Sequence, residues 1–293
     1  MTSFKMTSGG ITRTGLVYIP QSYDSSKATP LVIGYHGGFG EGQNQDNLTH
    51  MSKVADKENF LILYPDGINR HWNDGRAKAV EYGTVTDDVQ FTKDLIALAS
   101  KRLNIDTKRI YATGISNGGM MTYRVAREMT TTFAAAASVS SGTPVEQTTM
   151  QDPSTPIPML IMNGTDDPLL PFNGGEAAFS VGTLISTRDT INYWVKVNKA
   201  IPTPTTTQLP DTDPNDGTTI THESYPARSL GIYLTDGIKR PTDSAPVEFY
   251  QVNGGGHTWA GGNQYAKESA IGKTSRDVDA SQLIWDFFKQ FSR

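Results

Sequence analysis

The sequence predicts an α/β fold in which a mostly parallel central sheet is flanked by helices. Short apolar segments alternate along the chain with segments of helical periodicity, as the crossovers of a parallel sheet require. A glycine-rich turn at 114–118 also joins an apolar strand directly to a helix. We expect one domain spanning 1–293, because a chain of 293 residues can bury about three quarters of its unfolded surface around one core.

The individual elements follow from periodicity and from turn residues. Helices are expected at 87–103 and 276–291, where apolar residues recur every three or four positions, and at 119–128. Residues 199–246 are rich in Thr, Pro, Asp and Gly, and we expect an irregular excursion with a short hairpin around 219–235. Compact apolar or alternating segments predict strands at 14–20, 30–36, 60–65, 109–115, 133–140, 158–163 and 247–253.

A candidate nucleophile lies where the strand expected at 109–115 ends. The segment Gly114-Ile115-Ser116-Asn117-Gly118 has the form G-x-S-x-G, with glycines where a Cβ would clash in a sharp turn. Such a turn exposes Ser116, and the following helix directs its positive end and the Asn117 N–H toward an oxyanion. The segment therefore predicts a catalytic serine, although by itself it also fits a structural turn that happens to contain serine.

An acid and a histidine follow in the order Ser, Asp, His that hydrolases with this turn use. The apolar run 158–162 leads into a turn that contains Asp166 and Asp167. The alternating segment 247–252 leads into a glycine loop that carries His257. A serine hydroxyl needs an imidazole base within reach and a carboxylate that fixes the tautomer of the imidazole. The spacing predicts that these side chains meet in the fold.

The strand expected at 30–36 runs into His36-Gly37-Gly38-Phe39-Gly40. A glycine turn of this type supplies a second backbone donor to an oxyanion. We assign that donor to the N–H of Gly38 or Phe39, beside the N–H of Asn117. For the His36 side chain, a hydrogen-bonded structural role is the better interpretation.

Taken together, these segments resemble the polyhydroxybutyrate-depolymerase-like esterase family, which contains feruloyl and acetylxylan esterases. The resemblance implies an α/β-hydrolase fold. It maps the acid onto Asp167 and the base onto His257, and leaves Asp166 at a variable position. The chain departs from the family pattern at Ala260, at Asn163 and in its lack of cysteine. The matching segments are HGGFG at 36–40, WNDG at 72–75, TDDV at 86–89, GISNGGMMTYR at 114–124, NGTDDPLLPF at 163–172 and VNGGGHTWAGG at 252–262.

The resemblance implies a serine esterase that forms an acyl-enzyme with feruloyl or acetyl esters of plant cell-wall polysaccharide. A polyhydroxyalkanoate depolymerase or oligomer hydrolase is the alternative within the family. A serine peptidase of the same fold and an inactive carbohydrate-binding homologue are alternatives of other classes. The resemblance also implies a secreted enzyme in which Met1 replaces a removed signal peptide, with a cytoplasmic location as the alternative.

Composition limits the expected partners. The net charge is −4 with acidic and basic residues interspersed, which argues against nucleic acid. No apolar run approaches the ~20 residues of a membrane span. The absence of cysteine excludes disulfides, thiolate catalysis and zinc–cysteine sites. Serine acyl transfer needs no metal or organic cofactor, so we expect an ester substrate, no cofactor and no obligate protein partner.

Several residues near the motifs have two interpretations. Phe39, Trp72 and Trp259 are candidates for lining the substrate pocket, with core packing as the alternative. Asp87 or Thr86 is expected to cap the helix at 87–103, and the resemblance leaves open a role for Asp88 near the site. An acidic segment at 211–217 partly resembles an EF-hand loop. Its glycine is displaced and position twelve is His222, so a solvated turn is the better interpretation.

Overall fold

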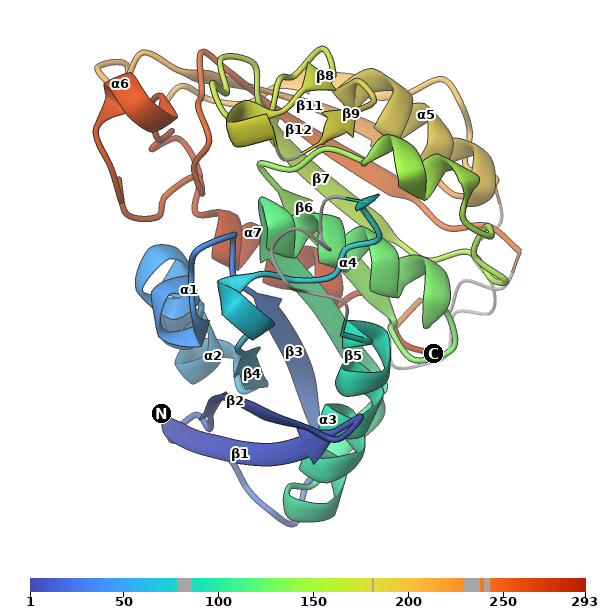
Figure 1. The fold of residues 1–293 in the computed structure, drawn as a ribbon. Coiled ribbons are helices and arrows are strands. Elements are labelled where there is room, and N and C mark those ends of the chain that lie inside the picture. Colours follow the sequence, from blue (N-terminus) through green and yellow to red (C-terminus); the bar gives the residue numbers. More distant parts are fainter. Residues whose placement is uncertain (78–85, 181, 229–237, 240–242) are drawn as a thin grey trace.

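The computed structural model describes residues 1–77, 86–180, 182–228, 238–239 and 243–293. Within these residues ten strands form one twisted sheet in the order β1-β2-β4-β3-β5-β6-β7-β12-β11-β10 (Figure 1). The strands are β1 (Thr2–Ser8), β2 (Ile11–Tyr18), β3 (Thr29–Tyr35), β4 (Leu61–Pro65), β5 (Ile105–Ile115), β6 (Ala135–Val139), β7 (Met159–Gly164), β10 (Thr205–Gln208), β11 (Thr219–Tyr225) and β12 (Val247–Asn253).

The centre of the sheet is parallel and its two edges are antiparallel. Strands β4, β3, β5, β6, β7 and β12 pair in parallel. At one edge β2 pairs antiparallel with β4 and with β1, and at the other β11 pairs antiparallel with β12 and with β10. The mostly parallel sheet predicted from the sequence is therefore confirmed, and an antiparallel hairpin forms each of its edges.

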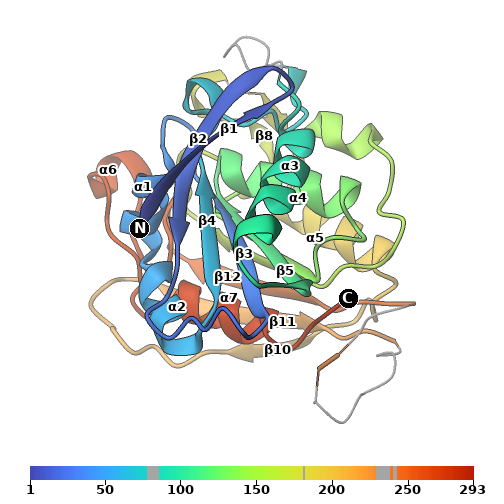
Figure 2. The same cartoon turned by 90° about the horizontal axis from the view of Figure 1, so that it is seen from below.

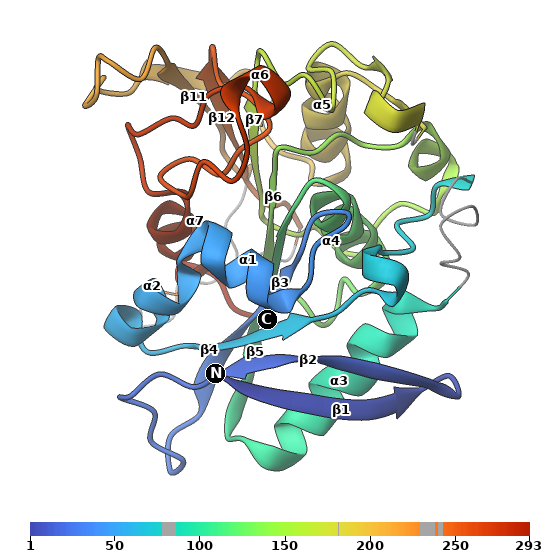
Figure 3. The ribbon, with the colours of Figure 1, turned by 60° about the vertical axis from the view of Figure 1, so that its left-hand side comes forward.

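Helices cover both faces of the sheet (Figures 2 and 3). In β3, Leu31 and Ile33 pack into a core with residues of α3, α4 and α5, while Val32 packs into the opposite core with α2 and α7. Successive side chains of a strand point to opposite faces, so a strand buried on both faces is apolar throughout. The helices are α1 (Gly42–Thr49), α2 (Met51–Glu58), α3 (Asp88–Arg102), α4 (Asn117–Glu128), α5 (Thr187–Val197), α6 (Glu268–Ile271) and α7 (Ala280–Phe288).

Short elements complete the loops above the sheet. A two-stranded ribbon pairs β8 (Gly175–Glu176) with β9 (Thr183–Leu184). The 3-10 helices are η1 (Ile68–Arg70), η3 (Val145–Thr149) and η4 (Ala178–Ser180). No helix in the described part of the chain is both long and apolar enough to cross a membrane.

The excursion expected at 199–246 is more regular than its composition indicated. Strands β10 and β11 extend the main sheet by an antiparallel hairpin over 205–225, instead of the hairpin expected around 219–235. Within Thr219–Tyr225, Ile220 packs into one core and Tyr225 into the opposite core, and β-branched and aromatic residues of this kind favour a strand. Residues 229–237 of the expected hairpin lie outside the described residues.

Candidate active site

Ser116 lies in a strained turn between β5 and α4. Its backbone has φ 59° and ψ −125°, a conformation that L-residues rarely adopt outside functional turns. The turn is so tight that a Cβ on Gly118 would collide with the carbonyl oxygens of Tyr35 and His36. A Cβ on Gly114 would collide with the carbonyl oxygen of Gly118. The two glycines of the G-x-S-x-G sequence therefore allow β5, α4 and the end of β3 to approach closely.

Two backbone N–H groups of the turns near Ser116 are the candidates for donating to an oxyanion. Asn117 begins helix α4, whose first amides have no partner within the helix. In the described part of the chain, neither the Asn117 N–H nor the Gly38 N–H has a hydrogen-bond partner. The Phe39 N–H instead donates to the Arg70 carbonyl at 2.9 Å. Of the two donors considered for the turn at 36–40, this leaves Gly38 as the available one.

Asp167 and His257 are in direct contact. His257 Nδ1 lies 2.7 Å from Asp167 Oδ2, and both side chains are at most 4% exposed. The other oxygen, Asp167 Oδ1, accepts hydrogen bonds from the N–H groups of Leu169 and Leu170 at 2.8 and 2.9 Å. Asp166 is exposed and its carboxylate accepts from Thr165 Oγ1. Of the two adjacent acids, only Asp167 is placed to orient the imidazole.

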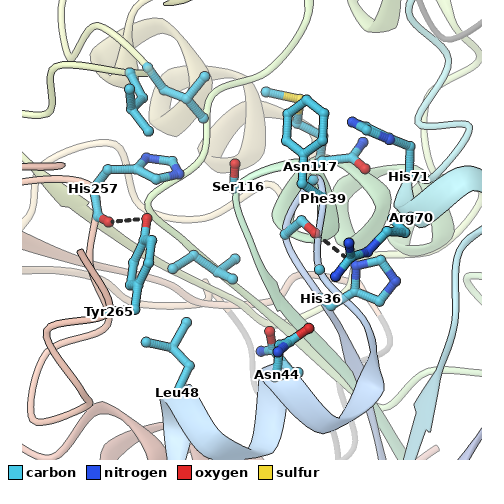
Figure 4. Close-up of a pocket in the computed structure, with 18 of the residues that line it drawn as sticks. His36, Phe39, Asn44, Leu48, Arg70, His71, Ser116, Asn117, His257 and Tyr265 are labelled. Atoms are coloured by element: carbon cyan, nitrogen blue, oxygen red, sulfur yellow. Dashed lines mark hydrogen bonds between the residues drawn. The ribbon is translucent and has the colours of Figure 1, made fainter. Parts of the chain in front are cut away.

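The loop that carries His257 is held by backbone and by an aromatic residue that the sequence analysis did not identify. The His257 N–H donates to the Ile271 carbonyl at 2.6 Å, and the Tyr265 hydroxyl donates to the His257 carbonyl at 2.9 Å (Figure 4). Partial burial of Tyr265, followed by the charge of Asp167, raises its pKa above the usual range, so the hydroxyl remains a donor. Tyr265 lies eight residues after the histidine, outside the quoted motif.

His36 is a structural histidine. Its Nε2 accepts a hydrogen bond from the Gly67 N–H at 2.9 Å, so the proton is on Nδ1, which lies 2.7 Å from the Gly37 carbonyl. Burial lowers the pKa of His36 to about 4. The neutral ring ties the turn at 36–40 to the loop after β4, in agreement with the structural interpretation.

The segment at 72–76 supports the site from beneath. The Asn117 side chain accepts from the Trp72 N–H at 2.8 Å and donates to the Trp72 carbonyl and to Asp74 Oδ2. Asp74 is fully buried and forms an ion pair of 2.7 Å with Arg76. Trp72, expected as a pocket residue, is 1% exposed and donates through Nε1 to the His36 carbonyl. That expectation was wrong, because the indole packs beneath the turn at 36–40.

Asp87 and Asp88 divide two tasks. The Asp87 side chain caps α3 by accepting from the Gln90 N–H, as expected. Asp88 is buried, forms an ion pair of 2.7 Å with Arg13 and accepts from the Asn73 N–H at 2.7 Å. Burial raises the pKa of Asp88, although the charge of Arg13 opposes the shift. Asp88 therefore holds the segment at 72–76 and is not among the pocket residues.

Trp259 was expected to line the pocket and instead lies in the core. Its side chain is fully buried between the sheet and α7, and its Nε1 donates to Ser281 Oγ at 3.1 Å. Position 259 follows the histidine by two residues, and the loop turns the indole away from the imidazole into the layer beneath. The expectation that Trp259 lines the pocket was wrong because its indole, like that of Trp72, is buried among other residues.

A pocket of about 840 Å³ opens over Ser116 and His257 (Figure 4). Phe39, the third aromatic candidate, lines it and is 60% exposed. Of the other lining residues, Met120, Leu169 and Leu170 lie within the quoted segments 114–124 and 163–172, whereas those at 44–48, 178–179 and 263–265 come from segments with no recognisable motif. On one side they include Asn44, Gln45, Asn47, Leu48, Asn263 and Tyr265; on another, Met120, Leu169, Leu170, Ala178 and Phe179.

The side chains of Asp213 and Asp216 in the acidic segment at 211–217 accept hydrogen bonds from backbone N–H groups. Asp216 accepts from the Thr218 and Arg276 N–H groups, and Asp213 from the Asn215 N–H. Within the described ranges no three His, Asp or Glu side chains gather in a metal-binding arrangement.

Comparison with solved structures supports the assignment of the fold. Acetyl xylan esterase from Aspergillus awamori superposes with a TM-score of 0.57 over 88% of this chain and 94% of that enzyme, at 16% identity. With the parallel sheet and the turn at Ser116, this match decides the fold. The chain has the α/β-hydrolase fold. Its residues 49–168 also match the model of the prolyl oligopeptidase family.

Two relatives of this chain are named as esterases. A protein of Nocardia uniformis subsp. tsuyamanensis named as an esterase, NocK, is 27% identical over 88% of this chain and 73% of its own length. Feruloyl esterase B of Piromyces equi is 26% identical over 96% of this chain. The chain spans 45% of the length of that esterase.

Proposed function

We propose that this α/β-hydrolase is a serine carboxylic-ester hydrolase whose catalytic residues are Ser116, His257 and Asp167, carried by a single domain. The contact of 2.7 Å between His257 Nδ1 and Asp167 Oδ2, together with the lining of one pocket by His257 and Ser116, is the observation that carries the proposal. The strained turn at Ser116 and the similarity to proteins named as esterases support it.

The reaction proceeds in two acyl-transfer steps. Ser116 Oγ attacks the ester carbonyl while His257 Nε2 takes the hydroxyl proton, and Asp167 holds the Nδ1 proton and stabilises the imidazolium. The N–H groups of Gly38 and Asn117 donate to the oxyanion of the tetrahedral intermediate. The imidazolium then protonates the leaving alcohol. Water repeats the sequence on the acyl-enzyme and releases the acid, with no cofactor.

The substrates we propose are feruloyl or acetyl esters of plant cell-wall polysaccharide. The pocket is large enough for an aryl acyl group and offers an apolar wall that includes Met120, Leu170 and Phe179. A relative named feruloyl esterase B and a structure titled acetyl xylan esterase support this class. A polymeric substrate of this kind lies outside the cell, so the proposal includes secretion of the enzyme.

A peptidase is the second candidate, because the match to the prolyl oligopeptidase family model covers residues 49–168. That range contains Ser116 and Asp167 but not His257. Hydrolysis of a matched pair, a p-nitrophenyl ester and a p-nitroanilide of the same acyl group, separates the two functions. We expect efficient cleavage of the ester only. Preferred cleavage of the anilide, or of a peptide, would favour the peptidase.

The nucleophile is tested by labelling with a serine-directed phosphonate. We expect one label, on Ser116, with complete loss of ester hydrolysis. Ser116→Ala and His257→Ala should each lower kcat by about 10⁴- to 10⁶-fold, and the double variant by little more, because the residues act as a unit. Both variants should unfold at nearly the wild-type denaturant concentration. More than a few per cent of wild-type activity in purified Ser116→Ala would contradict the assignment.

A further inference from the structure

The pocket has two chemically different sides. One side is apolar and includes Met120 of α4, Leu169 and Leu170 after Asp167, and Phe179 of η4. The other is lined by helix α1, which contributes Asn44, Gln45, Asn47 and Leu48. Figure 4 shows Asn44, Leu48 and Tyr265 together on one side of Ser116. Such a division suits an ester whose two halves differ in polarity.

Helix α1 is unusual for a helix beside an apolar pocket. Its sequence GQNQDNLT has carboxamides at four of eight positions, and Leu48 is its only large apolar residue. Positions 44, 45 and 48 share one face of a helix, because residues separated by three or four positions lie on the same side. A surface helix packed on a hydrophobic site normally presents an apolar stripe there. Here the face toward the pocket is mostly carboxamide.

These carboxamides have hydrogen-bonding capacity that the described protein does not use. Gln45 is 2% exposed, lines the pocket, and its Oε1 has no hydrogen-bond partner among the described residues. The exposed Asn44 side chain has no recorded partner in the same part of the chain. Asn47 Oδ1 accepts from Gln43, which leaves the Asn47 Nδ2 donor for a ligand. Buried polar groups without partners are costly unless a ligand satisfies them.

We propose that the α1 side of the pocket, defined by Asn44, Gln45, Asn47 and Tyr265, binds the alcohol half of the ester, which in the proposed substrates is the sugar. The inference rests on the proposed esterase function. Carboxamides donate and accept hydrogen bonds without charge, which matches neutral hydroxyl groups. Tyr265 is 49% exposed and adds an aromatic surface for the apolar face of a sugar ring.

The position of the base supports this assignment. The leaving alcohol oxygen must lie beside the imidazole, because the imidazolium returns the proton to it. The Tyr265 hydroxyl donates a hydrogen bond to the His257 carbonyl. Tyr265, which belongs to the α1 side, is therefore adjacent to the residue that supplies the base. The acyl group is then left to the apolar residues of the pocket, which include Met120 and Phe179.

The test compares two esters of the same acid, the methyl ester and the ester of a pentose methyl glycoside. The measured quantity is the ratio of kcat/KM for the sugar ester to that for the methyl ester. Asn44→Ala/Asn47→Ala should lower this ratio by about 10- to 100-fold, since each lost hydrogen bond is worth about 3- to 10-fold. Gln45→Met should lower the same ratio, because it removes a group proposed to bind the sugar. It should not lower the urea concentration at the unfolding midpoint, because the acceptor that it removes is buried and unpaired.

Two controls make the comparison specific. Asn192→Ala alters an exposed helical asparagine of α5 outside this pocket and should leave the ratio unchanged. Phe179→Ala changes the apolar side, and should lower kcat/KM by a similar factor for both esters. A wild-type enzyme that cleaves the methyl ester but not the sugar ester overturns the inference, as does an unchanged ratio in the double variant. No hydrolysis of any ester, and no label on Ser116, would overturn the esterase function itself.

Discussion

The carboxamide of Asn117 donates a hydrogen bond of 2.6 Å to the buried carboxylate of Asp74. Asn117 also exchanges two hydrogen bonds with the backbone of Trp72. Its own N–H is one of the two proposed oxyanion donors. The side chain of this residue therefore fixes the turn at Ser116 to the segment at 72–76.

Removing this connection should affect both stability and rate. Asn117→Ala deletes three hydrogen bonds in a buried region, and we expect a loss of about 2–4 kcal/mol in the free energy of unfolding. We also expect kcat/KM for an activated ester to fall by about 10- to 100-fold, because the oxyanion donor loses its support. Urea unfolding and ester kinetics measure the two effects. Wild-type kinetics in a destabilised variant would show that the contact serves folding only.

The two adjacent acids should behave differently. Asp167→Asn keeps an acceptor for the Leu169 and Leu170 N–H groups but no longer fixes the His257 tautomer, so kcat should fall by about 10³- to 10⁴-fold. Asp166→Asn, at an exposed position, should change kcat by less than about threefold and stability by about 1 kcal/mol at most. Steady-state kinetics on one ester compare both variants, and the reverse ranking would exclude Asp167 as the acid.

Protonation of His36 should destabilise the protein in mild acid. Burial lowers its pKa from 6.5 to about 4 in the folded chain, so between these values the unfolded chain binds more protons. Stability is then complete above pH 6.5 and is lost as the pH falls toward 4. From pH 7 to pH 5 this histidine should account for a loss of about 2 kcal/mol.

The variant His36→Gln isolates this effect. Urea unfolding of wild type and variant at pH 7 and pH 5 gives a double difference in which all other titrating groups cancel. The pH-dependent loss should be smaller in His36→Gln by about 2 kcal/mol. An equal loss of stability in both proteins would mean that His36 binds its proton at the same pH in the folded chain as in the unfolded chain.

Substitution of Trp259 should affect mainly stability, whereas substitution of Phe39 should affect mainly the preference between esters. Trp259→Ala empties a fully buried site and should cost about 3–5 kcal/mol, with little change in the ratio of kcat/KM for aryl and alkyl esters. Phe39→Ala, at a 60% exposed position, should change that ratio with a stability loss under about 1 kcal/mol. Methyl ferulate and methyl acetate provide the comparison. A change in preference confined to Trp259→Ala would contradict the placement of the indole in the core.

Motifs with strict local geometry were predictable from the sequence. The G-x-S-x-G turn requires glycines because neighbouring carbonyl oxygens occupy the space of a Cβ, and this requirement is visible in five residues. The helix at 87–103 and its cap at Asp87 were predictable for a similar reason, since periodicity and capping are local. The polar helix α1 was missed, because it has no apolar stripe to show its period.

The parallel sheet, the turn at Ser116, and an acid and a histidine after later strands could all be predicted from the chain alone. These depend on local backbone requirements and on the alternation of apolar segments. By contrast, the burial of Trp72 and Trp259 in the core and the position of Tyr265 and the α1 carboxamides at the pocket became visible in the folded chain. The direction of a loop side chain depends on packing between segments far apart in the chain, and single-sequence periodicity contains no record of that packing.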